Sequence, residues 1–148
     1  MRRLVGSEMC IRDSLMSQVP LVGAAEAKYA ASPKTTSLKY AIELMKRGRE
    51  EMLLVVSADR ALQGVVYLRD AQTQIEDFSD GKVGDILRDD HPVAHPGSTL
   101  EEGMQMLENS NTDVLPVLDW NDRVLGVANR VSIVKAYERA VPDKKDDL

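Results

Sequence analysis

An internal repeat constrains the fold of this 148-residue sequence more than any other feature. A shift of 62 positions aligns residues 36–70 with residues 98–132 without a gap, and apolar positions fall on apolar positions. The matched pairs include Leu38 with Leu100, Val55 with Val117, Gly64 with Gly126 and Val65 with Val127. Self-similarity at a fixed spacing indicates that a chain stacks copies of one structural unit. The sequence therefore predicts two copies of a single unit that bury a common core.

Each copy carries the same order of local signals. A helix comes first, because apolar residues recur three and four positions apart behind a Ser or Thr that can cap it. Two apolar, strand-length runs separated by a polar turn follow, and a second helical pattern ends the copy. A short extended segment precedes each first helix. The predicted elements are segment 29–32, helix 38–48, strands 52–56 and 62–66 and helix 68–78, and then segment 92–95, helix 100–107, strands 114–118 and 124–128 and helix 131–140.

The predicted fold follows from this order. One copy of about 60 residues buries only a thin core, whereas two packed copies bury much more. We therefore expect an α/β (α+β) fold in which two β-α-β-β-α repeats, related by a pseudo-twofold axis, pack as one compact module. The expected boundaries are 19–80 for the first repeat and 81–141 for the second. Residues 1–18 are expected to be a flexible or non-native arm, and residues 142–148 a disordered tail.

Composition excludes several classes of function. The formal charge of −5 argues against a nonspecific nucleic-acid binder, and the 4% of aromatic residues argues against a base-stacking surface. A single cysteine, Cys10, excludes an internal disulfide and a cysteine-rich zinc cluster. No apolar run approaches the roughly 20 residues that cross a bilayer. These features predict a cytoplasmic domain that binds no nucleic acid and does not insert directly into a membrane.

Two phrases carry a resemblance to a known family. They are VLPVLDWNDRVLGVANRVSIVKAY at 114–137 and its echo MLLVVSADRALQGVVYLRDA at 52–71. Both resemble the CBS domain, in which an aliphatic strand, a turn and a Gly-x-x-Thr-x-x-Asp pattern lead into the last helix of the repeat. The resemblance covers about residues 20–140, so the chain looks like a tandem CBS pair, also called a Bateman module.

The resemblance implies a regulatory function. Family members bind AMP, ADP, ATP or S-adenosylmethionine in clefts between paired repeats, and they are appended to transporters, channels and metabolic enzymes. The phrases LRDAQ and DILRDD look like the tails of glycine-betaine-type ABC transporter ATPases, whereas RVSIVKAYERA looks like the tails of chloride-channel-type proteins. We therefore expect a module that senses an adenosine-containing ligand, requires no cofactor, and controls an attached or partner transporter or enzyme.

The resemblance also implies ligand contacts in the first repeat. Asp70 stands at the ribose-binding aspartate of the family, and a carboxylate can accept hydrogen bonds from both hydroxyls of a ribose. The alternative is a helix-start aspartate favoured by the helix dipole. Tyr67 replaces the family's Thr or Ser, and its ring would cap or fill the cleft. Leu54 would line an apolar wall of the cleft.

The second repeat departs from the family pattern. Asn129 stands at the Thr/Ser position and Ser132 at the Asp position, so Ser132 would hold a ribose less strongly. Arg130 and the free amides of the last helix could hold a phosphate; the alternative is that Arg130 is a solvated turn residue. We therefore expect the two sites to differ.

The remaining ligand contacts expected from the resemblance lie in the second repeat. The backbone of Val93, Ala94 and His95 would read the edge of an adenine. Pro116 would line an apolar wall, and its missing N–H also suits a strand irregularity. His91 and His95 would lie about 13 Å apart in an extended chain, too far to share a metal ion. We therefore expect no metal site.

The sequence lacks GxxxxGK[ST], GxGxxG, HExxH and GxSxG motifs, so we expect a non-enzyme.

Two non-enzymatic functions remain open. The alternative to ligand sensing is a structural dimerisation module of a membrane transport protein, with degenerate, non-binding clefts. A homodimer is expected in either case, because apolar helix residues such as Ile86, Leu87, Ile133 and Val134 exceed what one small core absorbs.

Overall fold

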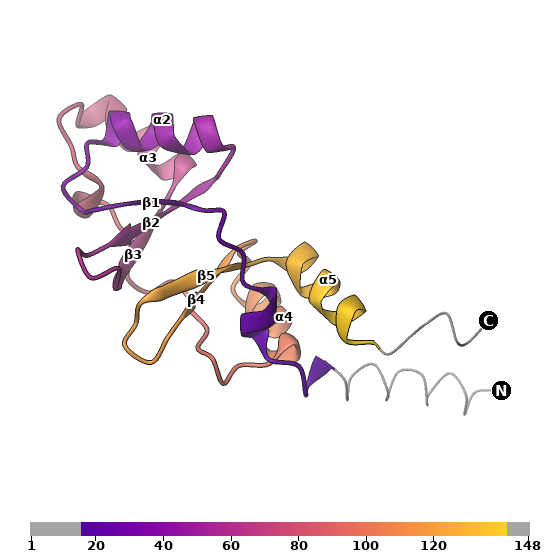
Figure 1. Cartoon of the computed structure of the whole chain (residues 1–148). Helices are drawn as coiled ribbons and strands as arrows, with labels where there is room; N and C mark the ends of the chain where they lie inside the picture. The colour runs from indigo at the N-terminus through magenta and orange to yellow at the C-terminus, as the bar shows by residue number, and fades with distance from the viewer. Residues whose placement is uncertain (1–15, 142–148) are drawn as a thin grey trace. The chain divides into compact units, whose positions relative to one another are not determined.

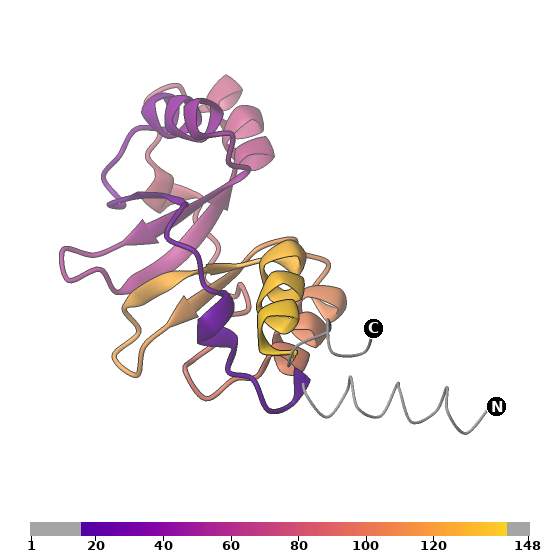
Figure 2. The same cartoon turned by 45° about the vertical axis from the view of Figure 1, so that its right-hand side comes forward.

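The computed structural model of the chain describes residues 16–141 (Figures 1 and 2). The elements in chain order are η1 (Leu21–Ala24), β1 (Ala30–Ser32), α2 (Leu38–Gly48), β2 (Met52–Val56), β3 (Leu62–Tyr67), α3 (Leu68–Asp77), η2 (Val83–Asp85), α4 (Leu100–Asn109), β4 (Leu115–Leu118), β5 (Val124–Ala128) and α5 (Arg130–Ala140), where η marks a short 3-10 helix. The mixed helix and strand content predicted from the sequence is confirmed. Cys10, most of the predicted arm and the predicted tail lie outside the described residues.

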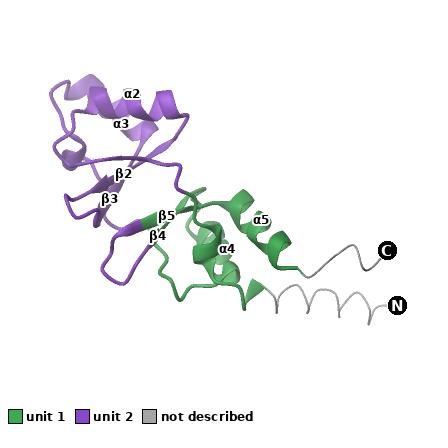
Figure 3. Cartoon of the chain, viewed as in Figure 1, with its two compact units in different colours: residues 1–26, 92–117, 125–148 green, residues 27–91, 118–124 purple. Residues whose placement is uncertain are grey.

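The chain forms two compact units (Figure 3). The described part of unit 1 comprises residues 16–26, Pro92–Val117 and 125–141, and unit 2 comprises Ala27–His91 and Leu118–Val124. These units follow packing rather than chain order, because the segment before β1 joins unit 1 and the segment after α3 joins unit 2. The repeat boundaries at 80 and 81 therefore stay a prediction about the sequence and are not the borders of the compact units.

Unit 2 is built on a three-stranded sheet. β1 pairs parallel with β2, and β3 pairs antiparallel with β2, in the order β1-β2-β3. Four of the five β2 residues are buried, as expected of a strand with both faces covered. α2 begins where the Ser37 hydroxyl accepts a hydrogen bond from the Tyr40 amide at 3.2 Å. The core comprises Leu38, Ala41, Met45, Leu53, Val55, Val66, Ala71 and Val83.

Unit 1 packs η1, α4 and α5 together with the two-stranded sheet β4-β5, whose turn belongs to unit 2. α4 begins with a reciprocal cap. The Thr99 hydroxyl accepts from the Glu102 amide at 3.2 Å, and the Glu102 carboxylate accepts from the Thr99 amide at 2.9 Å. The core comprises Leu21, Ala24, Ala94, Leu100, Leu107, Leu115, Val117, Ala128, Ile133 and Ala136.

The backbone repeats with the same shift as the sequence. Left-handed residues outside glycine occur at Arg49 and Asn111 after the first helix of each copy, with φ of 57° and 52°. They occur again at Arg60 and Asp122 in the strand-to-strand turns, with φ of 70° and 63°. Each pair is 62 positions apart. Since few residues adopt this conformation, the paired positions are independent evidence that both copies follow one chain path.

The repeat also begins earlier than the alignable sequence. In unit 1, isolated bridges join Pro20 to Thr99 and Glu26 to Val127. In unit 2, the residues that the 62-position shift matches to these form the same bridges, Lys82 with Ser37 and Arg88 with Val65. A Cβ atom at Gly126 would lie 2.8 Å from the Glu26 carbonyl oxygen, and one at Gly64 would lie 2.8 Å from the Arg88 carbonyl oxygen. Both glycines therefore permit the same close approach of backbone.

The extended segment predicted at 92–95 pairs over a shorter stretch than its counterpart β1. Residues 92–95 do not form a strand; only Ala94 makes a bridge, with Val117. Two prolines, Pro92 and Pro96, interrupt the row of amide donors there, so a longer ladder is not formed. None of the helices between residues 16 and 141 combines the length and the apolar character that crossing a membrane requires.

Candidate ligand-binding site

The candidate site lies at the start of α3 in unit 2, where strand β3 runs directly into the helix. Tyr67 is the last residue of β3 and the N-cap of α3, with extended backbone at φ −86° and ψ 143°. Its side chain makes no capping hydrogen bond. The first-turn amides of α3, unlike those of α2 and α4, are therefore without a side-chain cap.

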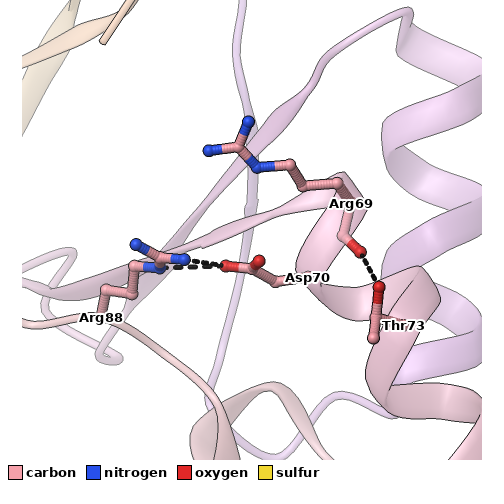
Figure 4. A network of polar contacts seen from close by, with 4 residues as sticks. All are labelled: Arg69, Asp70, Thr73 and Arg88. Carbon is pink, nitrogen blue, oxygen red and sulfur yellow. Dashed lines mark hydrogen bonds and ion pairs between the residues drawn. The ribbon is translucent and has the colours of Figure 1, made fainter. Parts of the chain in front are cut away.

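Asp70 lies in this first turn and binds Arg88 (Figure 4). Its Oδ2 atom accepts from Nε of Arg88 at 2.9 Å and forms an ion pair with Nη2 at 2.7 Å. The backbone brings Arg88 there, because Val65 and Arg88 exchange two N–H···O hydrogen bonds of 2.9 and 2.8 Å beside Gly64. The side chains are 29% and 48% exposed, so the pair is worth only about 0–1 kcal/mol and is exchangeable.

Two cations lie close to the aromatic ring of Tyr67. The guanidinium carbon of Arg69 lies 5.4 Å from the ring centroid, and that of Arg88 lies 5.3 Å from it. The His91 ring is 5.9 Å from the Tyr67 ring at a tilt of 52°. Cation–π attraction holds both guanidinium groups near the uncapped start of α3. With one carboxylate and two guanidinium groups, this cluster carries a net positive charge.

Leu54 has a packing role in unit 2. It has no exposed surface and lies in the central strand β2, opposite Ala31 on one side and Val65 on the other. Neighbouring strands and side chains cover Leu54 in unit 2, and its predicted place in an apolar wall of the ligand cleft stays a prediction.

The corresponding position in unit 1 is closed by its own hydrogen bonds. The Ser132 amide donates to Oδ1 of Asn129 at 2.8 Å, and the Asn129 amide donates to the Ser132 hydroxyl oxygen at 2.9 Å. The Ser132 hydroxyl also donates to the Asn129 carbonyl at 3.1 Å, and Ser132 is only 3% exposed. Both residues thus form a reciprocal cap of α5, which the sequence reasoning did not foresee.

The other predicted residues of unit 1 also have local partners. Nη1 of Arg130 pairs with Asp113 at 3.1 Å, and both side chains are largely exposed. The Ala94 amide donates to the Pro116 carbonyl at 2.9 Å, so it is not available to read an adenine edge. Pro116 is buried in β4, and Val93 and His95 are half-buried. The role predicted for the backbone of Val93, Ala94 and His95 in reading an adenine edge stays a prediction, with the Ala94 amide already paired.

The predicted site residues divide between the units. Leu54, Tyr67 and Asp70 lie in unit 2, and Val93, Ala94, His95, Pro116, Asn129, Arg130 and Ser132 lie in unit 1.

The sequence reasoning missed Arg69 and Arg88. The sequence repeat contained a signal for Arg88. The 62-residue shift aligns Arg88 with Glu26 and Asp70 with Ser132, so the two copies differ in charge at both positions. Within the part of the chain that the structure describes, no three His, Cys, Asp or Glu side chains gather to hold a metal ion.

The residues expected to drive dimerisation are not equally exposed. Ile133 is fully buried in the core of unit 1, which corrects that expectation. Ile86 and Leu87 pack partly buried against the core of unit 2. Val134 is 46% exposed, and Val131, one turn away on α5, is 62% exposed. The exposed apolar face thus lies on α5 and comprises Val131 and Val134.

Comparison with known proteins gives one family match. Residues 83–139 match the family model of the CBS domain. The chain is 26% identical over 142 residues to the glycine betaine/carnitine/choline transport ATP-binding protein OpuCA of Bacillus subtilis (strain 168). That alignment covers 93% of this chain but 37% of the relative, so the chain spans little more than a third of that protein.

Two solved structures share the fold. A CBS domain-containing protein of unknown function from Bacillus anthracis str. Ames Ancestor superposes with a TM-score of 0.76 at 15% identity, over 87% of this chain and 99% of that one. CBSX2 in complex with AMP superposes with a TM-score of 0.63 at 23% identity, over 83% and 93% of the two chains. At these identities the likeness establishes the fold alone.

Proposed function

Because the chain is a CBS-pair protein, with its CBS domain match at residues 83–139, we propose that it is a regulatory module that senses an adenosine-containing nucleotide. The module would control an attached or partner transporter or enzyme, and it would act in the cytoplasm without a catalytic role. Two relatives support this proposal: CBSX2 was solved with AMP, and OpuCA is a transport ATP-binding protein.

The observation that carries the proposal is the Asp70–Arg88 pair at the uncapped start of α3. A ribose diol is a pair of donors, and Asp70 offers a carboxylate that accepts two hydrogen bonds. A phosphate is a divalent anion, and Arg88 and Arg69 offer planar guanidinium groups beside the start of α3, which has no side-chain cap. A nucleotide thus supplies a partner to each group when it separates Asp70 from Arg88.

Unit 2 is the better candidate for the nucleotide. In unit 1, Ser132 replaces the aspartate, its hydroxyl caps α5, and Glu26 stands where unit 2 has Arg88. A carboxylate at that position repels a phosphate, whereas a guanidinium attracts it. Arg130 keeps its proposed role as a second phosphate contact, since its ion pair with Asp113 is exposed and weak.

Calorimetric titration of the full chain with adenosine, AMP, ADP, ATP and S-adenosylmethionine tests the proposal. A nucleotide at about 100 times its Kd should add about 2.7 kcal/mol to the free energy of unfolding. Arg88→Gln should weaken nucleotide binding about tenfold and leave adenosine binding within twofold, because only the nucleotide offers a phosphate. Arg47→Gln is the matched control, since Arg47 is an exposed cation of unit 2 on α2. No heat with any adenosine compound contradicts the proposal.

A second candidate function is a structural homodimerisation module. The exposed Val131 and Val134 of α5 favour it, because two apolar side chains three positions apart present one surface on a helix. Sedimentation at tens of micromolar should show a dimer that Val134→Lys dissociates, with Lys135→Ala as the control. A dimer that binds no adenosine compound would replace nucleotide sensing with this function.

A further inference from the structure

The side chains at the start of α3 form a cluster of one aromatic ring and two guanidinium groups that unit 1 lacks. The 62-position shift pairs each member with a residue of another chemical type: Tyr67 with Asn129, Arg69 with Val131, and Arg88 with Glu26. Both copies nevertheless follow one chain path, as their paired left-handed residues show. The repeated fold therefore does not require the cluster, and its three members are present together in one copy and absent together from the other.

The ring of Tyr67 is the common contact of the two cations. The guanidinium carbons of Arg69 and Arg88 lie 5.4 and 5.3 Å from its centroid, so one half-buried ring confines both groups to the same neighbourhood. Cation–π attraction offsets part of the rotamer entropy that a fixed arginine side chain loses. The counterpart Asn129 caps its helix, whereas Tyr67 makes no capping hydrogen bond. The residue at this position therefore holds cations in one unit and a helix start in the other.

The two cations are not equally neutralised. Arg88 pairs with Asp70 at 2.7 Å, whereas Arg69 forms no ion pair within residues 16–141 (Figure 4). Two positive charges near one ring repel each other, and one carboxylate cancels only one of them. The cluster therefore attracts an anion. Phosphate groups suit it, because a planar guanidinium donates two parallel hydrogen bonds to phosphate oxygens.

The charge of the cluster ranks the adenosine compounds. Adenosine is neutral and gains nothing from the guanidinium groups. S-adenosylmethionine carries a sulfonium and an ammonium group beside one carboxylate, so its net charge is positive and the cluster repels it. A nucleotide with two or three phosphates carries the most negative charge and offers a separate phosphate to each guanidinium group. The cluster therefore favours a nucleoside di- or triphosphate.

We propose that Tyr67 is a positioning residue that makes this site select a nucleoside di- or triphosphate over S-adenosylmethionine and adenosine. Its ring holds the guanidinium groups of Arg69 and Arg88 together before the ligand arrives, so less ordering is left for the binding step. The inference rests on the proposed nucleotide site of unit 2, and it adds the class of ligand and the residue that determines the selection.

Calorimetric titration of the full chain with ADP, adenosine and S-adenosylmethionine tests the proposal. ADP should bind about tenfold more tightly than the other two. Tyr67→Leu should weaken ADP binding about fivefold and leave adenosine binding within about twofold, because only the phosphates need the guanidinium groups. Tyr67→Phe keeps the ring and should bind ADP within about twofold of wild type. Tyr40→Leu is the matched control, since Tyr40 is 50% exposed on α2 of unit 2, outside the cluster.

A double-mutant cycle separates positioning from a general structural role of Tyr67. In an Arg69→Gln background, the effect of Tyr67→Leu on ADP binding should fall from about fivefold to about twofold, because one of the two guanidinium groups is gone. An effect that stays fivefold would mean that the ring does not act through Arg69. Far-UV circular dichroism of each variant shows whether the fold is retained.

Three further results would overturn the proposal and leave the proposed nucleotide site standing. They are S-adenosylmethionine binding as tight as that of ADP, a Tyr67→Leu protein that binds ADP like wild type, and a Tyr67→Phe protein that loses as much as Tyr67→Leu. The absence of heat with all three compounds is a different outcome, because it contradicts the nucleotide site itself and this proposal with it.

Discussion

Gly64→Ala tests whether the close approach of residues 87–88 to β3 is what holds Arg88 against Asp70. The added Cβ would lie 2.6 Å from Cδ1 of Leu87 and 2.8 Å from the Arg88 carbonyl oxygen. Since the second neighbour is backbone, the segment must move away from β3. Overpacking of this kind costs about 1–3 kcal/mol, and weakening the two Val65–Arg88 hydrogen bonds costs about 0.5–1.5 kcal/mol each.

The expected loss in the free energy of unfolding is therefore about 2–6 kcal/mol. Urea denaturation followed by far-UV circular dichroism measures it. Gly48→Ala is the matched control, because its nearest neighbour is Cγ of Glu50 at an ordinary 3.5 Å and the residue is helical. That variant should gain about 0.4–1 kcal/mol, so the same chemical change has opposite signs at two sites.

Hydrogen exchange gives a second readout of the same change. The amides of Val65 and Arg88 should exchange faster in Gly64→Ala, because each donates to the other residue's carbonyl. A Gly64→Ala protein as stable as wild type, with unchanged exchange at both amides, would refute the close-approach argument.

Further predictions concern the capping and the charged groups. Asn129→Ala should lower the free energy of unfolding by about 0.5–2 kcal/mol in urea denaturation, because α5 loses its reciprocal cap; a change below the error of the fit would contradict the cap. A double-mutant cycle on Asp70→Ala and Arg88→Ala should give a coupling of about 0–1 kcal/mol without ligand, and a larger one would mean the pair is not exchangeable. The Arg123 and Asn121 amides lower the pKa of Asp119, so the carboxyl NMR resonance of Asp119 should titrate below the ordinary range of an aspartate. The stability that these contacts contribute is present above the unfolded-state pKa and is lost as the pH falls through the folded-state pKa. A titration midpoint in the ordinary range would contradict these contacts.

The elements with strong periodicity were predictable. α2 carries apolar residues at helical spacing behind Ser37, and β2 is a continuous apolar run, so their local signals and their tertiary burial agree. η1 and η2 were not predicted, because three or four residues are too few to show a period. Their place in the repeat became visible only through the bridges of Glu26 and Arg88.

The candidate site was only partly predictable for a different reason. The motif gave the position of Asp70, since the spacing from Gly64 is local. Its partner Arg88 is 18 residues away and is placed by a backbone bridge to Val65, which no local pattern encodes. Ser132 was predicted as a ligand contact, whereas its hydroxyl caps α5 in the structure. A serine hydroxyl is equally suited to either role, and the sequence does not distinguish them.

The bridges at Glu26 and Arg88 have a practical consequence for anyone who divides this chain. A fragment cut at the family match, residues 83–139, would carry η2 without the β3 strand that holds it, and would leave behind Leu21 and Ala24, which have 0% and 2% exposed surface in unit 1. The residues of one sequence repeat and the residues of one compact unit are thus not the same stretch of chain. Expressed alone, such a fragment would expose the core residues of unit 1 that Leu21 and Ala24 cover, and it would bury them again by pairing with the missing segment of a second molecule.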